Sequence, residues 1–223
     1  MMRIRYPWLA AALAAAFFLG FGQSLTAAEN AAPSIEPAAA LAKLQAGNAR
    51  FVSAATSASK PTRARRLETA QAQHPFAIIV ACSDSRTAPE IIFDQNLGDL
   101  FIVRTAGEVI DSYELGSIEY AAEHLGAHLI VVCGHARCGA VKAALDGGDL
   151  PGHVAAIARE IAPAAAAVRG QPGDPLQNAI KSNVDRVAKQ IRKQAELGAV
   201  ASKVRVVEAY YDFDTGKVEW LKE

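Results

Sequence analysis

Cysteine is scarce in this sequence, and an excess of either charge is absent. Only 3 cysteines occur among 223 residues, too few for a disulfide scaffold of this length, so each thiol has to be considered for its own chemistry. Lysine plus arginine and aspartate plus glutamate each number 23, which gives a formal net charge of zero. Without a basic excess we expect no nucleic-acid partner, and without an acidic excess nothing indicates disorder.

Internal repeats are also absent, which excludes a solenoid, and the one long apolar run lies at the N-terminus. Arg3 and Arg5 precede an apolar run over 8–21, and small residues follow at 26–28. This order is typical of a signal peptide, so we expect residues 1–28 to be removed and the chain to be periplasmic or secreted. The run, at about fourteen residues, is short for spanning a bilayer, and an uncleaved anchor is the alternative. After processing we expect no stable membrane insertion.

The remaining chain is predicted to form one domain behind a tether. Residues 29–37 contain two prolines and little apolar bulk, as in a linker. The spacing of Leu41 and Leu44 suits a helix, so we interpret 38–71 as an N-terminal helical arm of a single domain over 38–223. The overall hydrophobic content of 51% is enough for a sizeable core.

Short apolar runs alternate with amphipathic segments in this domain. Strands are expected at 76–81, 100–103 and 129–133, and helices at 88–94, 111–124, 141–145, 153–168 and 174–197, the fourth of them interrupted at Pro163. A final run over 204–211 turns into 218–221, as in a hairpin. The order predicts an α/β fold: a mainly parallel β-sheet flanked by helices, with an antiparallel edge strand.

Chemically distinctive residues follow two of these strands directly. Residues 82–86 read Cys-Ser-Asp-Ser-Arg, and residues 134–139 read Gly-His-Ala-Arg-Cys-Gly. Because loops at the carboxyl ends of parallel strands share one crevice, we expect both motifs to face the same pocket. Cys82, His135 and Cys138 then supply two thiolates and an imidazole, a donor set that leaves tetrahedral zinc one open position.

A disulfide between Cys82 and Cys138 is the competing interpretation, because a signal peptide predicts an oxidising compartment. Zinc is preferred, since a disulfide leaves His135, Asp84 and Arg86 without a role. The guanidinium of Arg86 can fork onto the Asp84 carboxylate two residues away. Such a pair braces the loop, and its closeness to Cys82 predicts that the carboxylate also reaches the metal or the group bound to it.

Two neighbouring residues of the motifs are also interpreted. Cys133 lies inside an apolar strand two residues before His135, and we interpret it as a core thiol rather than a fourth ligand. Gly139 follows Cys138 directly, and we expect it to allow a tight approach to the site.

These motifs resemble the zinc signature of the β-class carbonic anhydrases. The similarity covers about 38–221, with supporting pieces at 47–51, 99–104, 116–120 and 211–216. The resemblance implies one Zn²⁺ per subunit, held by Cys82, His135 and Cys138 with water or hydroxide in fourth place. It implies reversible hydration of carbon dioxide to bicarbonate and a proton, by attack of the zinc-bound hydroxide.

The resemblance also assigns roles around the metal. The Asp84–Arg86 dyad would orient the hydroxide, and Gln73, Phe101 and Tyr120 would form the carbon dioxide pocket. Gly139 is included among the substrate-binding positions.

Some members of that family let the aspartate close onto the metal, so Asp84 is a possible fourth ligand in a closed state. A bicarbonate-gated form is disfavoured, because Ile79 stands where such members carry tryptophan. The family's active site lies at a dimer interface that N-terminal helices embrace, so a homodimer or homotetramer is expected. Glu108 and Glu208 depart from the family pattern, where asparagine and glycine are usual.

Two other functions stay open from the sequence. One is hydrolysis of carbonyl sulfide or carbon disulfide, since relatives with the same ligands use such substrates. The other is a non-catalytic zinc-binding or thiol-redox module with a closed site.

Overall fold

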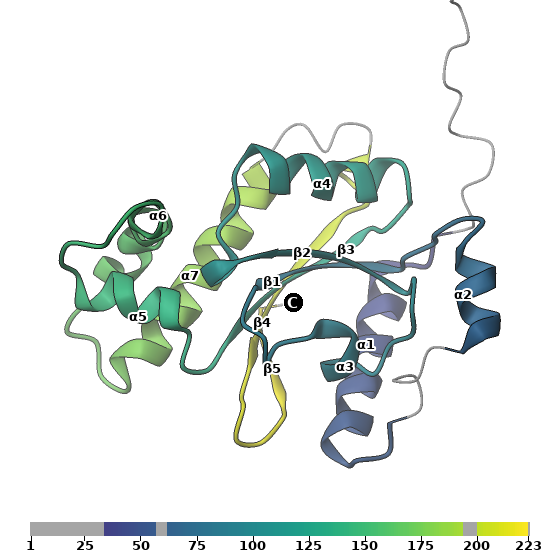
Figure 1. Cartoon of the computed structure of the whole chain (residues 1–223), viewed down its shortest axis with the longest axis horizontal. Helices are drawn as coiled ribbons and strands as arrows, with labels where there is room; N and C mark the ends of the chain where they lie inside the picture. Colours follow the sequence, from purple (N-terminus) through teal and green to yellow (C-terminus); the bar gives the residue numbers. More distant parts are fainter. Residues whose placement is uncertain (1–33, 57–61, 194–199, 223) are drawn as a thin grey trace, which may run out of the picture. The chain divides into compact units, whose positions relative to one another are not determined.

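The computed structural model describes residues 34–56, 62–193 and 200–222 (Figure 1). The predicted signal peptide over 1–28 and most of the predicted tether lie outside these residues. Within the described part, no helix combines the length and the apolar character needed to cross a membrane.

A five-stranded sheet forms the centre of the domain, in the order β2-β1-β3-β4-β5. The strands are β1 (Ala77–Cys82), β2 (Leu100–Thr105), β3 (Leu129–His135), β4 (Arg205–Tyr211) and β5 (Val218–Lys222). The first four pair in parallel and β5 is antiparallel to β4. The predicted mainly parallel sheet with an antiparallel edge is therefore confirmed. Every residue of β1 and β3 is buried, as expected for unbroken apolar strands covered on both faces.

Seven α-helices and one 3₁₀ turn surround the sheet in the described residues. They are α1 (Pro37–Val52), α2 (Arg63–Thr69), α3 (Pro89–Ile92), α4 (Ser112–Glu123), α5 (Gly139–Asp146), α6 (Val154–Ala167), α7 (Pro175–Lys193) and η1 (Ala106–Glu108). The predicted break at Pro163 is wrong, because α6 continues through it. Pro163 is exposed, so water can bind the carbonyl that loses its donor, while Ile161 and Ala165 hold the helix in the core. The part of α7 predicted beyond Lys193 lies outside the described residues until position 200.

Helices cover both faces of the sheet (Figure 1). Odd positions of β1 and β3, such as Ile79 and Val131, pack with α1 and α3. Even positions, such as Ile78 and Val132, pack with α4 and α7. This alternation follows from the two-residue period of a strand.

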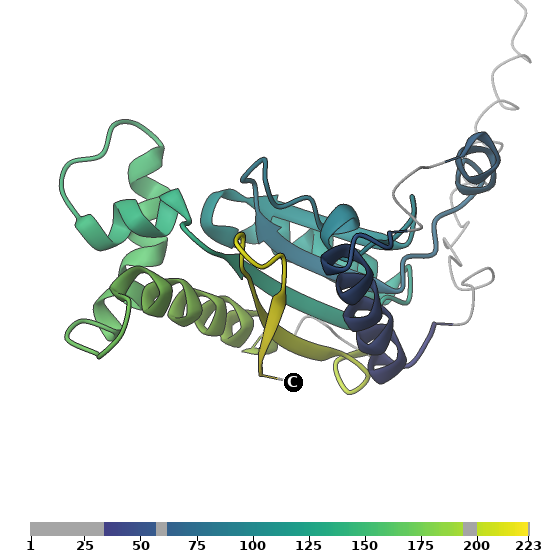
Figure 2. The ribbon, with the colours of Figure 1, turned by 90° about the horizontal axis from the view of Figure 1, so that it is seen from below.

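The predicted N-terminal arm divides into two parts. Ala40 and Leu44 of α1 are fully buried against the chain's own sheet, and Figure 2 shows α1 lying along that face. The Asn48 side chain donates to Ile92 O at 3.2 Å and accepts from Val218 N at 2.9 Å. We therefore describe α1 as part of the domain core, whereas α2 has no buried residue.

A third apolar cluster lies beyond the carboxyl ends of the strands. Val141 of α5, Ile161 of α6 and Ile180 of α7 are buried there together with Cys82 and Cys138. In Figure 1 these helices extend the domain past the ends of β1 and β3. The two predicted motifs lie where the sheet meets this helical group.

Candidate metal centre and active site

Three side chains converge where β1 and β3 end. The donor atoms of Cys82, His135 and Cys138 all lie within 4.8 Å of one another, and all three residues are buried. Cys82 is the last residue of β1, His135 is the last residue of β3, and Cys138 caps the N-terminus of α5. The expectation that both motifs face one pocket is confirmed for these three residues.

The register of the sheet explains this convergence. Ala81 pairs with Cys133 in the parallel ladder, so β1 and β3 reach the same edge of the sheet almost level. The chain then reverses at Arg137, whose φ of 55° lies in the left-handed region, and this turn brings Cys138 back toward the strand ends. Two strands and one turn therefore place residues that are 56 positions apart in the sequence side by side.

The protonation of His135 leaves one nitrogen directed at the cluster. Its Nδ1 lies 2.9 Å from Ala136 O, so Nδ1 carries the proton and donates it to that carbonyl. Nε2 is then an acceptor, and it is buried without a hydrogen-bond partner among the described residues. Leaving a buried polar atom without a partner costs free energy. A metal ion would supply this partner, and the two neighbouring thiols are suitable ligands for the same ion.

The two thiols of the cluster differ in acidity. A hydrogen bond between them lowers the pKa of Cys82 and raises that of Cys138. The Gly107 N–H also donates to Cys82 Sγ at 3.2 Å, which further favours the Cys82 thiolate. All three cysteines are free. Two sulfur donors and one imidazole nitrogen that lacks a partner fit a zinc ion.

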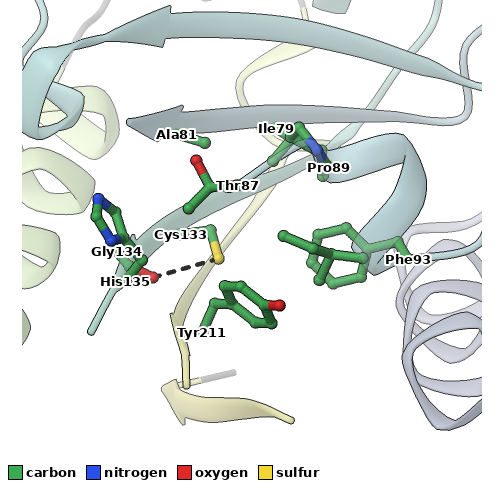
Figure 3. Close-up of a pocket in the computed structure, with 10 residues that line it drawn as sticks. Ile79, Ala81, Thr87, Pro89, Phe93, Cys133, Gly134, His135 and Tyr211 are labelled. Carbon is green, nitrogen blue, oxygen red and sulfur yellow. Dashed lines mark hydrogen bonds between the residues drawn. The ribbon is translucent and has the colours of Figure 1, made fainter. Parts of the chain in front are cut away.

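Cys133 is separate from this cluster. Figure 3 shows its thiol pointing toward Tyr211 and away from the His135 imidazole, in a small cavity on the α3 side of the sheet. The thiol lies 3.6 Å from Gly134 O. Burial raises its pKa to about 12, so it stays protonated at neutral pH. The prediction of a core thiol is confirmed.

Asp84 and Arg86 form the predicted ion pair beside the cluster. Arg86 Nε donates to Asp84 Oδ1 at 2.9 Å and Nη2 donates to Oδ2 at 2.7 Å. These hydrogen bonds hold the pKa of Asp84 well below its usual range, so the carboxylate is ionised at neutral pH. Asp84 Oδ2 lies 4.0 Å from His135 Nε2, which places the carboxylate next to the donor cluster but turned toward the guanidinium.

The loop that carries the dyad is pinned by residues that the sequence interpretation missed. Arg104 donates to Cys82 O at 2.8 Å and to Asp84 O at 2.6 Å, and Thr87 Oγ1 donates to Asp84 O at 2.8 Å. Arg104 belonged to one of the supporting pieces of the resemblance. Its position at the end of an apolar strand, opposite Ala81, was the available signal for this role.

Glu108 lies close to the metal cluster and interacts electrostatically with Cys82 and His135. Its side chain is fully buried and accepts from Asn183 Nδ2 at 3.0 Å, while Oε2 has no partner among the described residues. Burial raises its pKa to about 7. The second departure, Glu208, is also buried but binds Arg192 Nη1 at 2.7 Å. Glu208 therefore has a structural partner, whereas Glu108 places a poorly solvated acid near Cys82.

The residues expected to form the substrate pocket lie elsewhere in the chain. Phe101 and Tyr120 are neighbours, with ring centroids 6.4 Å apart. In β2, Phe101 lies four residues before Thr105, the residue that pairs with Cys82. Four residues of a strand span about 13 Å, so Phe101 lies well away from the metal cluster. Gln73 is exposed in the segment before β1. One chain does not bring these three side chains to the metal cluster, and their role stays a prediction.

Comparison with known proteins identifies the family. The model of the carbonic anhydrase family matches residues 77–218. A carbonic anhydrase of Mycolicibacterium smegmatis is 41% identical over 194 residues, which span 84% of this chain and 94% of that protein. The chain belongs to the carbonic anhydrase family. Carbonic anhydrase 2 of Mycobacterium tuberculosis is 50% identical over 135 residues, 59% of this chain and 65% of that protein.

Solved structures place this carbonic anhydrase in the β class. A Coccomyxa β-carbonic anhydrase in complex with acetazolamide has a TM-score of 0.65 at 26% identity and covers 70% of this chain and 75% of its own. A structure from a study of two tetrameric β-carbonic anhydrases of Sordaria macrospora has a TM-score of 0.67 at 23% identity, over 70% and 85% of the two chains. The family and the donor set together fit zinc-dependent hydration of carbon dioxide.

One steric expectation about this β-carbonic anhydrase is not met. A Cβ built on Gly139 meets no described atom within 4 Å, so a single chain makes no close approach there. Within the same motif it is Gly134 that a side chain would crowd, because its added Cβ would lie 2.6 Å from Val184 Cγ2. The strand end therefore packs tightly on α7, and the turn before α5 is open. A substrate-binding role of Gly139 stays a prediction.

Proposed function

We propose that this chain catalyses reversible hydration of carbon dioxide to bicarbonate and a proton, as a homo-oligomer outside the cytoplasm. The observation that carries the proposal is the buried His135 Nε2, which lacks a partner yet lies within reach of two thiols and of an ionised Asp84. This arrangement combines a soft metal site with a fixed hydrogen-bond acceptor. A purely structural metal site has no need of the acceptor.

Cys82, His135 and Cys138 would hold the zinc, which when bound supplies a Lewis acid that makes water a nucleophile near neutral pH. The chain's own residues do the positioning. The Asp84 carboxylate, kept ionised by Arg86, can only accept a hydrogen bond. It therefore accepts from the attacking water and directs a lone pair of that water at the carbon of the substrate.

The apolar side of the pocket would come from a second copy of the chain. Tyr120 is 47% exposed and Phe101 is half-buried beside it, although large apolar rings usually lie inside. Phe101 lies at the opposite end of β2 from Thr105, and Tyr120 of α4 packs beside it. A dimer that brings this end of one chain to the metal of its partner supplies the pocket that one chain lacks. The tetrameric Sordaria enzymes support oligomerisation.

The compartment is proposed from the N-terminal segment alone. The basic start, the apolar run and the small residues before position 29 favour export and cleavage. The mass of the protein recovered from a periplasmic extract tests this. A chain that retains residues 1–28 would contradict cleavage.

Stopped-flow hydration of carbon dioxide on the zinc-loaded protein tests the activity. Cys82→Ser should lower kcat/KM by about a thousandfold or more, because it removes a thiolate donor, and should lower the zinc content. Cys133→Ala is the matched control: it changes a buried thiol outside the cluster, so zinc content and turnover should remain close to those of the wild type.

Two other outcomes, with carbonyl sulfide assayed alongside carbon dioxide, would replace the proposal. Sulfide release from carbonyl sulfide without hydration would indicate the hydrolase. A folded, zinc-loaded protein that turns over neither substrate would indicate a non-catalytic module.

A further inference from the structure

Phe213 lies at the meeting point of the metal cluster and two arginines. Its ring centroid is 4.3 Å from Arg86 Cζ and 5.4 Å from Arg137 Cζ. It is also 5.3 Å from the centre of the His135 ring and packs edge-on against Tyr211 at 5.4 Å. A single aromatic side chain therefore contacts a predicted zinc ligand and the guanidinium of the dyad.

The turn that carries Phe213 is held in place on both sides of the ring. Asp212 Oδ1 accepts from Asp214 N at 3.1 Å and from Thr215 N at 2.8 Å. The Asp214 carboxylate in turn binds Arg137 through Nη1 at 2.8 Å and Nη2 at 3.0 Å. The Asp212 turn fixes the backbone after Phe213, and the ring itself packs on Tyr211 and His135, so it is held in one position.

Arg86 needs such a surface. Its side chain is 54% exposed, and the hydrogen bonds of its guanidinium within the described residues go to Asp84 alone. An exposed ion pair contributes little by itself, because a long side chain loses rotamer freedom to hold one geometry. An aromatic face under the guanidinium attracts the cation and reduces the number of rotamers that the Arg86 side chain can adopt.

We propose that Phe213 is a positioning residue: it holds Arg86 in the geometry that keeps the Asp84 carboxylate turned toward the guanidinium and away from the metal donors. Asp84 Oδ2 already lies 4.0 Å from His135 Nε2, so the carboxylate is close to the metal donors even while it is paired with Arg86. Release of Arg86 frees the carboxylate to approach the metal position. The expected effect on turnover rests on the proposed function, whereas the contact between Phe213 and Arg86 does not.

The contact is tested directly by hydrogen exchange. In the wild type, Arg86 Nε–H donates to Asp84 Oδ1, and NMR can follow the exchange of this proton with water. The signal is assigned by its loss in Arg86→Lys. Phe213→Leu keeps an apolar side chain but removes the aromatic face, so exchange should become roughly three- to fivefold faster. Phe213→Tyr keeps the face and should match the wild type.

Pentafluorophenylalanine at position 213 is a second variant that preserves the shape of the ring. Fluorination reverses the charge distribution of the ring face, so the ring no longer attracts the Arg86 guanidinium. Exchange of the Arg86 proton should therefore become faster, as in Phe213→Leu. Phe51→Leu is the matched control, because Phe51 packs on Tyr211 at 6.4 Å, and among the described residues the arginines that lie over an aromatic ring both lie over Phe213. It should leave the exchange rate unchanged.

Turnover separates this inference from the proposed function. If the protein hydrates carbon dioxide, Phe213→Leu should lower kcat more than it raises KM, and Phe213→Tyr should restore kcat. If the wild type shows no hydration, the exchange experiment still decides whether Phe213 holds Arg86. Wild-type exchange rates in both the leucine and the pentafluoro variants would overturn the inference.

Discussion

The two ends of the sheet differ in how complete they are within one chain. At the carboxyl end, Cys82 and His135 close two adjacent strands and meet Cys138 within 4.8 Å. At the other end, Phe101 and Tyr120 contact each other at 6.4 Å but leave Tyr120 47% exposed. The metal half of the proposed active site is assembled by the fold, whereas the apolar half faces outward.

This difference follows from what positions each group. Hydrogen bonds to and from the backbone place the metal half: the parallel ladder sets the strand ends level, the Gly107 N–H binds the Cys82 sulfur, and the Arg104 side chain binds the carbonyl of Cys82. The aromatic pair rests on the start of β2 and on α4, with no described element covering it. We therefore expect the two halves to act together only across two copies of the chain.

The largest effect is expected from complementation between two inactive variants. His135→Ala removes the metal half, and a Phe101→Ala/Tyr120→Ala double variant removes the apolar half, so each alone should lose most of its kcat/KM. Coexpressed at equal levels, they should recover about a quarter of the wild-type activity per site, because half of the assembled dimers are mixed and each mixed dimer holds one intact site. Stopped-flow hydration measures the recovery.

Two further mixtures complete the complementation experiment. Coexpression of His135→Ala with Cys82→Ser is the control, since both variants lack the metal half and should recover nothing. Failure of the first mixture to exceed this control, in assemblies shown by mass spectrometry to be mixed, would contradict a pocket shared between copies.

The pH dependence of stability tests whether Glu108, next to the metal half, is held protonated by burial. Burial raises the pKa of Glu108 from 4.5 to about 7, so the folded protein keeps this proton over a range where the unfolded chain has released it. The free energy of unfolding of the wild type, relative to Glu108→Gln, should therefore fall as the pH rises from about 4.5 to about 7, and then level off. The total change should be about 3 kcal/mol.

Urea unfolding of the metal-free protein at several pH values measures this difference. Glutamine keeps the oxygen that accepts from Asn183 Nδ2 at 3.0 Å, so packing is preserved and the comparison isolates the titrating proton. A difference between the two proteins that stays flat, or that rises with pH, would show that Glu108 is not held protonated by burial.

The smallest expected effect is at Gly139, the first residue of α5, directly after Cys138. Its added Cβ meets no described atom within 4 Å, and an alanine at the start of α5 favours the helix. Gly139→Ala should leave Tm within a few degrees of the wild type. A loss of kcat/KM without a loss of Tm, measured on the same preparation, would place a second copy or the substrate against this position.

Much of the metal half could be predicted because its signals are local. Two apolar runs end in Cys82 and in His135, and parallel strands bring their carboxyl ends to one edge. The role of Arg104 could not be predicted in this way, because an arginine at a strand end has several possible partners. Phe213 gave even less signal, since an aromatic residue in a hairpin turn usually indicates only packing.

The order of strands and helices along the chain, the donor set for zinc and the pairing of Asp84 with Arg86 could all be predicted from residue type and from spacings of a few positions. Three features appear only in the folded protein: His135 Nε2 has no hydrogen-bond partner among the described residues, Cys133 points away from the cluster, and Phe213 lies under Arg86. These facts depend on register, on a turn and on which face of a strand each side chain occupies. Small differences in packing set all three, and no local pattern records them.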